Sequence, residues 1–276
     1  GGLWWLVDPD GRLFFSHGVD CVRHGAETGI QYRENYFAWL PEKDSPFEVF
    51  YGKASWAPHG FYKDKNTFRT FNFAGANLLR KYGEAWFDEH VDLAHRRIRA
   101  WGLNTVANWS DDKVYLKRRT PYTVCLHTGG PRIEGSDGWW GKFPDPFAKE
   151  FIEGIQQRAR DQQKPGTVND PWCIGYFVDN ELSWGKDDRA LALSALLSPA
   201  TQPAKLAFRD WLEKRYATVA ALNAAWGTDF AAWDAFLATT NKPSEERCGA
   251  DLEAFHSQIA EQYFRVIRDA VKAAAP

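Results

Sequence analysis

The sequence predicts an α/β fold of four parallel β/α units, and three observations support this prediction. Short apolar segments alternate with helical segments over roughly the first 180 residues, which is typical of a parallel sheet with right-handed crossovers. Polar side chains stand at or beyond the ends of the apolar segments, where the strands of a parallel barrel line an active site. No fifth strand follows, although about 250 residues usually suffice for eight strands.

The first strand is expected at 13–22, after the turn signal DPDG at 8–11. Residues 23–85 then form an aromatic, proline-punctuated stretch with weak periodicity. This stretch is far longer than an ordinary connection, which favours a functional insertion that builds one wall of a cleft.

The central units follow from helical spacing, stop signals and apolar runs. A helix is expected at 86–101, because its apolar residues recur at helical spacing and Gly102 ends it. A second amphipathic helix is expected at 146–163, with Asp145 as its N-cap. The remaining elements are a short helix at 111–118 and strands at 104–109, 122–127 and 173–179.

The carboxyl-terminal third reads as helical. Helices are expected at 208–216 and 219–226, ended by Gly227, and a long amphipathic helix at 251–275. Residues of about 190–250 are therefore a helical insertion after the fourth strand. The whole of 1–276 is predicted to be a single domain.

Composition limits the classes of partner. A net charge of -2 and a pI near 6.4 argue against nucleic acid or an anionic membrane as the main partner. No apolar run reaches about 18 residues, so no membrane span is predicted. Aromatic residues make up 16% of the chain, which mildly favours carbohydrate binding. The chain holds no methionine and opens on two glycines, which indicates a processed, tagged or partial sequence, in which a removed signal peptide would leave no trace. We expect a soluble protein with no signal peptide among the given residues, and the sequence indicates no location.

The cysteines and histidines indicate neither a disulfide framework nor a metal site. Cys21, Cys125, Cys173 and Cys248 show no CxxC pairing, and we expect buried, reduced thiols. No two His or Cys residues show ligand spacing, so no metal and no other cofactor are predicted.

The segment WCIGYFVDNELSW at 172–184 carries the main catalytic candidate. It reads as an apolar strand that ends on Asn180, Glu181 and Trp184. A carboxylic acid at Glu181 can protonate a sugar oxygen at the mouth of a barrel. The alternative is a strand-end carboxylate that caps the next helix or pairs with an arginine.

Further candidates for substrate binding are aromatic or strand-end residues. Trp109 and Trp184 are sugar platforms or pack under loops, and Trp139 and Trp140 belong to a glycine-rich loop that favours binding. His127 contacts a sugar hydroxyl, orients Glu181 or is structural. The other candidate contacts are Asn108, His24 and Glu27.

Two aspartates are substitute nucleophiles in principle. These are Asp20 and Asp179. Alternate side chains of a strand point to opposite faces, so Asp179 is the poorer candidate beside Glu181.

Four segments of the chain carry a resemblance to a known family: RLFFSHGVDCV, ETGIQYRENYFAWLP, RRIRAWGLNTVANWSD and GYFVDNELSWG. They resemble the family 50 β-agarases, which are retaining glycoside hydrolases with (β/α)8 TIM barrels. The segment 208–230 also resembles the helical insertion of the family 42 β-galactosidases. The resemblance runs from near the N-terminus to the last helix.

The resemblance implies agarase or β-galactosidase activity on β-linked galactose-containing polysaccharide. It implies that Glu181 is the general acid/base and that Asn180 binds the sugar 2-hydroxyl. The nucleophile of these families is a glutamate at the seventh strand, which this sequence lacks. The implied fold is half of a (β/α)8 TIM barrel. The open alternatives are an inactive or weakly active half barrel that binds carbohydrate and one half of a split enzyme.

A half barrel leaves two strand edges and an apolar face uncovered. We therefore expect a homodimer or higher homo-oligomer that covers the open sheet edges. The expected ligand is a polysaccharide or oligosaccharide.

Overall fold

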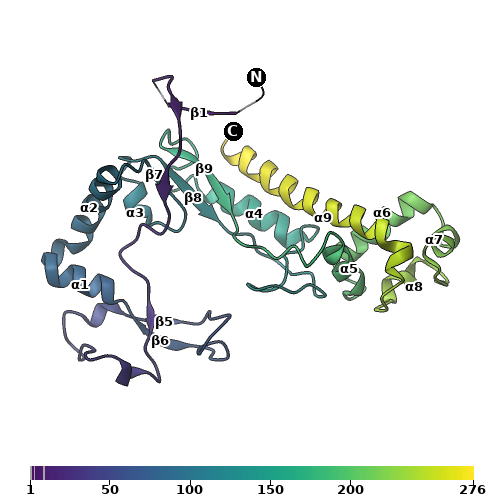
Figure 1. Cartoon of the computed structure of the whole chain (residues 1–276), viewed down its shortest axis with the longest axis horizontal. Helices are drawn as coiled ribbons and strands as arrows, with labels where there is room; N and C mark the ends of the chain where they lie inside the picture. The colour runs from purple at the N-terminus through teal and green to yellow at the C-terminus, as the bar shows by residue number, and fades with distance from the viewer. Residues whose placement is uncertain (1, 3, 9) are drawn as a thin grey trace. The chain divides into compact units, whose positions relative to one another are not determined.

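The computed structural model describes residues 2, 4–8 and 10–276, which form two compact units (Figure 1). The first unit comprises the chain up to Cys125 together with Asn169–Phe177. The second comprises Leu126–Val168 and Val178–Pro276. The chain passes between them near the ends of strands β8 (Tyr122–Leu126) and β9 (Cys173–Val178).

A four-stranded sheet organises the first unit. Its order is β3 (Gly18–Val19), β7 (Thr105–Val106), β8 and β9, so neighbours in the chain are neighbours in the sheet. The pairs β3–β7 and β7–β8 are parallel. The prediction of an α/β fold with a parallel sheet is therefore confirmed.

The first predicted strand is wrong in extent, because the segment 13–22 serves two sheets. Strand β2 (Leu13–Phe14) pairs antiparallel with β1 (Leu6–Val7), and only β3 joins the parallel sheet. The backbones at Gly18 and Thr105 approach so closely that a Cβ on Gly18 would lie 2.3 Å from the Thr105 carbonyl oxygen. Gly18 thus permits this close pairing.

The insertion at 23–85 contains a small antiparallel sheet that its weak periodicity did not reveal. Its order is β4-β6-β5, and a core of Ile30, Phe50, Phe71 and Ala76 supports it. Strands this short show too few residues for an alternating pattern. The elements are β4 (Thr28–Gly29), η1 (Glu34–Tyr36), η2 (Glu48–Phe50), β5 (Tyr51–Ala54), β6 (Phe68–Phe71), α1 (Phe73–Tyr82) and η3 (Gly83–Ala85).

Helix α2 (Trp86–Ala100) confirms the prediction for 86–101. Its apolar face buries Val91, Ala94 and Ile98, and Val114 of α3 (Asp112–Tyr115) packs against this face. The short helix predicted at 111–118 is therefore present but brief.

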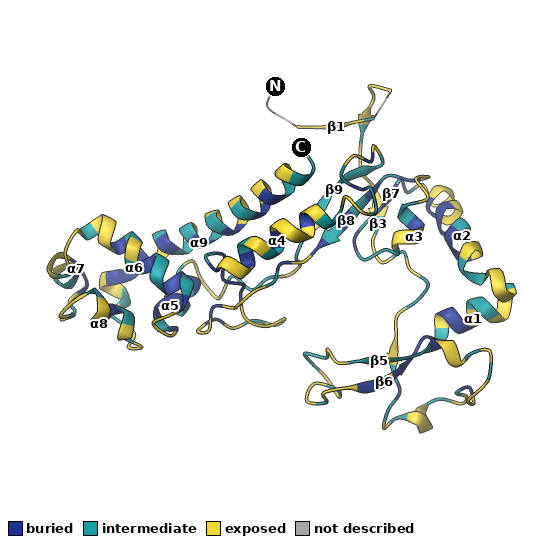
Figure 2. Ribbon diagram, turned by 180° about the vertical axis from the view of Figure 1, so that it is seen from behind, coloured by how far each residue is buried: buried dark blue, intermediate teal, exposed yellow. Residues whose placement is uncertain are grey.

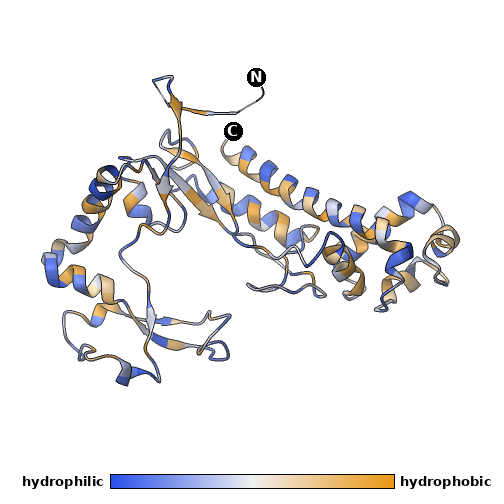
Figure 3. Ribbon diagram, in the orientation of Figure 1, coloured by the Kyte–Doolittle hydropathy of each residue, from blue (hydrophilic) through white to orange (hydrophobic). Residues whose placement is uncertain are grey.

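The second unit is helical, as predicted. Helix α9 (Glu245–Ala274) packs against α4 (Lys149–Asp161) and α5 (Ala190–Leu197), and its buried and apolar residues form one continuous stripe (Figures 2 and 3). The predicted helical pair is present as α6 (Pro203–Tyr216) and α7 (Val219–Trp226). Helices α5 and α8 (Trp233–Ala238) were not predicted, because both are short and α5 is apolar nearly all round.

The prediction that Asp145 caps α4 is wrong. Helix α4 begins at Lys149 with Ala148 as its N-cap, and Asp145 is fully buried. Asp145 instead accepts hydrogen bonds from the Ala204 N–H and the Gln202 side chain, at the start of α6. It therefore satisfies a helix terminus 59 residues away in the chain.

The burial predictions for β9 and for the cysteines need correction. Most of β9 is half-buried, and Phe177 is 56% exposed, because β9 is an edge of the sheet rather than a buried strand. All four cysteines are free, but only Cys248 is buried, and Cys21 is exposed. Cys21 is exposed because it lies beyond the end of β3, whereas the sequence predicted it inside a longer strand at 13–22.

Over residues 2, 4–8 and 10–276, the helices are either too short or too polar for one of them to cross a membrane.

Candidate active site

Glu181 lies just beyond β9 in the second unit, on a backbone with two left-handed residues. Asp179 and Glu181 have φ of 56° and 49°, a region that non-glycine residues rarely adopt. Such strain is characteristic of functional sites. The Glu181 carboxylate is exposed, and the indole N–H of Trp140 donates a hydrogen bond of 2.5 Å to its Oε2 atom. An exposed carboxylate held by one donor is free to approach a ligand with its other oxygen.

Asp179 anchors the turn that carries Glu181. Its carboxylate accepts hydrogen bonds from the Thr128 backbone N–H (2.7 Å), the Thr128 hydroxyl (2.5 Å) and the Tyr263 hydroxyl (2.8 Å). Burial and the neighbouring carboxylate raise the pKa of Tyr263, which keeps its hydroxyl protonated as a donor. With both oxygens engaged, Asp179 is a positioning residue. This agrees with the expectation that it is the poorer nucleophile.

Replacing Tyr263 with phenylalanine tests this anchor. The variant keeps the aromatic packing but removes one hydrogen bond to a charged acceptor. We expect the free energy of unfolding to fall by about 1.5 kcal/mol. Urea denaturation followed by circular dichroism measures it, and a Tyr263→Phe protein as stable as the parent would contradict the anchoring role.

The tryptophans of the second unit differ in their surroundings. Trp184 packs in an aromatic cluster, with ring centroids 4.7 Å from Phe143 and 5.7 Å from both Tyr263 and Phe264. This is the packing alternative that the sequence left open. Trp139 is 66% exposed and meets Trp140 edge to face at 6.2 Å. Trp140 therefore brings its indole to Glu181, and the exposed ring of Trp139 lies against Trp140.

His127 and Asn180 are also exposed in the second unit. His127 Nδ1 lies 3.9 Å from Asp179 Oδ1, so His127 lies beside the carboxylate that anchors the turn.

Asn108 and Trp109 belong to the first unit, directly after β7. Asn108 is buried, its side-chain oxygen accepts from the Thr123 hydroxyl (3.0 Å), and its carbonyl accepts from the Cys21 N–H. Trp109 has φ of 57°, so another strand end also carries a left-handed residue. Asp20, at the end of β3, is exposed.

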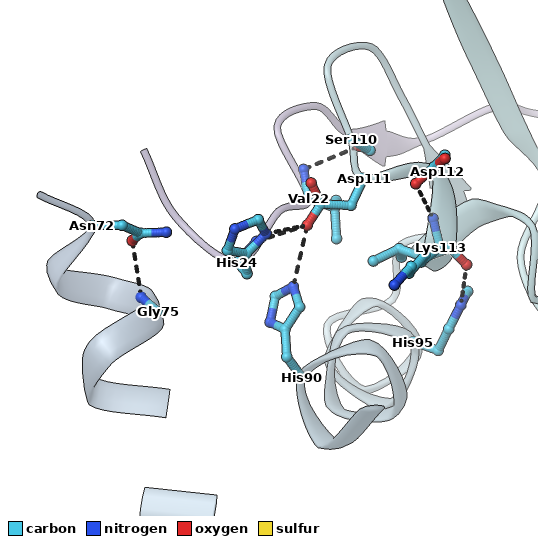
Figure 4. Close-up of polar contacts among 11 residues, drawn as sticks. Val22, His24, Asn72, Gly75, His90, His95, Ser110, Asp111, Asp112 and Lys113 are labelled. Atoms are coloured by element: carbon cyan, nitrogen blue, oxygen red, sulfur yellow. Dashed lines mark hydrogen bonds and ion pairs between the residues drawn. The ribbon is translucent and has the colours of Figure 1, made fainter. Parts of the chain in front are cut away.

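His24 also lies in the first unit, where Asp111 fixes it (Figure 4). Asp111 Oδ2 lies 2.9 Å from both the backbone nitrogen and Nδ1 of His24. Because a carboxylate only accepts, Nδ1 carries the proton, and Nε2 is left for another partner. His90 Nε2 lies 4.0 Å from the same oxygen, and burial lowers the pKa of His90.

Glu27 accepts a hydrogen bond of 2.5 Å from the Thr70 hydroxyl and is exposed. Asp111 and Tyr263 are positioning residues that the sequence did not indicate. Each sits in a helix or at its start, where no local pattern separates it from ordinary polar or core residues.

A search of the residues that the structure describes finds no cluster of three His, Cys, Asp or Glu side chains able to hold a metal ion.

Comparisons with known proteins show what the chain resembles. It is 32% identical over 310 residues to β-agarase B of Vibrio sp. (strain JT0107), covering all of this chain and 32% of that protein. β-Agarase A of the same strain is 30% identical over 303 residues, with all of this chain and 29% of that protein covered. The solved structure of an exo-β-agarase matches 99% of this chain and 44% of its own, with 28% identity and a TM-score of 0.89.

The chain is a homologue of the family 50 β-agarases. A family model described as β-galactosidase also matches residues 169–276, the part that carries Glu181 and the helical unit. The resemblance seen in the sequence is therefore confirmed. This agarase homologue spans about a third of the length of the curated relatives it matches.

Proposed function

We propose that this chain belongs to a retaining glycoside hydrolase that acts on β-linked galactose-containing polysaccharide, with Glu181 as general acid/base. The observation that carries the proposal is the exposed Glu181 carboxylate, held by Trp140 on a strained turn after a parallel strand. Its setting in a chain similar over its full length to β-agarases supports the substrate class.

The roles follow from retaining chemistry. Glu181 protonates the leaving glycosidic oxygen and then removes a proton from the attacking water. Asn180, the adjacent exposed amide, binds the sugar 2-hydroxyl. The second carboxylate of a retaining pair stands about 5–5.5 Å from the first. We assign this nucleophile to no residue of 1–276, because Asp179 is engaged and Asp20 has no support beyond its exposure.

The remaining contacts differ in support. Trp139 and Trp140 offer indole faces on which the C–H faces of a sugar stack. We also propose His127, Asn108, Trp109, Trp184, His24 and Glu27 as contacts. Among these, His24 is the best supported, because Asp111 orients its ring.

We further propose that the four-strand sheet is half of a (β/α)8 barrel and that residues 1–276 form one catalytic-type domain. The sequential strand order, with β3 and β9 as edges, supports the half barrel. Residues 23–85 and about 190–250 are then insertions after the first and fourth strands.

An uncovered edge predicts self-association, most simply as a homodimer. Strand β9 is an edge strand with Phe177 more than half exposed, and such edges favour pairing with another chain. We expect light scattering to give at least twice the 31.5 kDa mass of one chain. A Phe177→Lys variant should shift the equilibrium toward the monomer. A monomer at micromolar concentration in the parent protein would contradict this proposal.

An assay of hydrolysis distinguishes an active enzyme from a half barrel that binds carbohydrate without cleaving it. The chain and its Glu181→Gln variant are incubated with agarose and with an aryl β-galactoside, and reducing ends are measured. Faster release by the parent supports the enzyme. Equal trace release by both proteins contradicts turnover by this chain and favours either carbohydrate binding without turnover or one half of a split enzyme.

A further inference from the structure

A cationic pocket lies in the first unit at the amino-terminal ends of the strands. Its volume is about 380 Å³, and its lining includes Arg96, Arg99, Arg119, Asp92, His95 and Trp172. Arg96 and Arg99 come from the last turns of α2, Arg119 from the approach to β8, and Trp172 directly precedes β9. Asn108 and Trp109 follow β7 at its other end, so the pocket is separate from these site candidates.

The guanidinium charges of this pocket are only partly compensated. Asp92, its one lining carboxylate, pairs with Arg119 at 2.7 Å. Within residues 2, 4–8 and 10–276, neither Arg96 nor Arg99 forms an ion pair with a carboxylate. Two of the three positive charges thus face the pocket without an anionic partner.

His95 adds no charge to the pocket. Its Nε2 donates to the Val114 carbonyl (2.9 Å), so Nδ1 is left to accept from the Thr120 hydroxyl (3.0 Å). Burial lowers the pKa of His95, which keeps the ring neutral. The attraction for an anion therefore comes from the arginines and does not depend on His95.

Arg97 and Arg99 both lie in the last turn of α2, where a cation stabilises the helix. Arg99 also lines the pocket, as does Arg96. Arg97, however, does not line the pocket. Arg97 thus provides a matched control for the two arginines that do.

We propose that this pocket binds the sulfate group of a sulfated galactan chain. Guanidinium groups bind tetrahedral oxyanions through paired, charge-assisted hydrogen bonds. The Trp172 indole supplies a flat apolar face against which the sugar ring that bears the sulfate can pack. The choice of a galactan as the carrier rests on the proposed function; the oxyanion itself follows from the pocket.

Calorimetric titration tests the pocket. The ligands are a sulfated galactan oligosaccharide, the same oligosaccharide after desulfation, and sodium sulfate, all at one ionic strength. The proteins are the full chain, the Arg96→Gln/Arg99→Gln variant and the Arg97→Gln variant. All three substitutions fall on exposed residues, so the fold is retained.

The full chain should bind the sulfated oligosaccharide more tightly than the desulfated one. The double variant should weaken binding of the sulfated form by about tenfold or more. Arg97→Gln should leave its affinity unchanged. Equal affinity for both oligosaccharides, or an equal loss in the Arg97→Gln protein, would overturn the proposal.

Sodium sulfate separates the two sources of the oxyanion. Binding of inorganic sulfate as tight as that of the oligosaccharide would overturn the galactan as the ligand. Because these experiments measure binding, their outcome does not depend on whether Glu181 catalyses hydrolysis.

Discussion

In the retaining hydrolase to which we propose this chain belongs, replacing Glu181 with glutamine is expected to lower hydrolysis of agarose by about 10²- to 10⁴-fold. Glutamine keeps the shape of the side chain and can still accept the Trp140 N–H. It cannot protonate the leaving oxygen, which is a poor leaving group in a polysaccharide. The loss therefore measures proton transfer rather than packing.

Substrates with different leaving groups distinguish an acid/base role of Glu181 from a structural role. The acidic phenol of an activated aryl β-galactoside leaves as a phenolate without being protonated. Glu181→Gln should therefore slow cleavage of this substrate much less than cleavage of agarose. Azide attacks a glycosyl-enzyme intermediate without needing a base, so where the nucleophile of the retaining pair is present it should displace that carboxylate, restore turnover of the Glu181→Gln protein and yield a glycosyl azide. Reducing-sugar assays and chromatography of the products measure both effects. Equal losses on agarose and on the activated galactoside would contradict an acid/base role.

A matched variant controls for the loss of one charge. Glu153→Gln makes the same chemical change on the exposed surface of α4, in the same unit. It should hydrolyse agarose at the parent rate.

The largest effect on stability is expected at Asp145. Its buried carboxylate accepts from the Gln202 side chain (2.5 Å), the Ala204 N–H (2.9 Å) and the Phe147 N–H (3.0 Å). Asp145→Ala leaves these three donors without their acceptor in a site closed to water. We expect the free energy of unfolding to fall by about 3 kcal/mol.

Urea denaturation measures this loss, and two variants bracket it. Asp145→Asn retains one acceptor oxygen and should lose less than Asp145→Ala. Asp229→Ala removes an exposed aspartate of the same unit and should change stability by less than about 0.5 kcal/mol. An Asp145→Ala protein as stable as the Asp229→Ala protein would show that Asp145 does not hold the start of α6.

Local pattern predicted much of the fold and the main candidate. Helix α2 and strands β8 and β9 lie within one or two residues of their predicted bounds. Glu181 lies just beyond a parallel strand, as expected. These features depend on periodicity and stop signals within a few residues of each other, which a sequence displays directly.

Short elements could not be predicted from periodicity and stop signals. The antiparallel sheet of the insertion has strands of two to four residues, too short for a period. Local propensity predicts one strand over 13–22, because it does not show that the two ends of this segment pair with different partners.

The sequence by itself determined the alternation of strands and helices, the place of Glu181 after the fourth strand and the resemblance to agarases. Only the tertiary structure decided which groups hold the site. The bond from Tyr263 to Asp179 joins residues 84 apart, and that from His24 to Asp111 joins residues 87 apart. Periodicity reports the face that a residue presents on its own element. The partner of a polar side chain is set instead by how distant elements pack, because each buried donor or acceptor takes the partner that folding brings within reach.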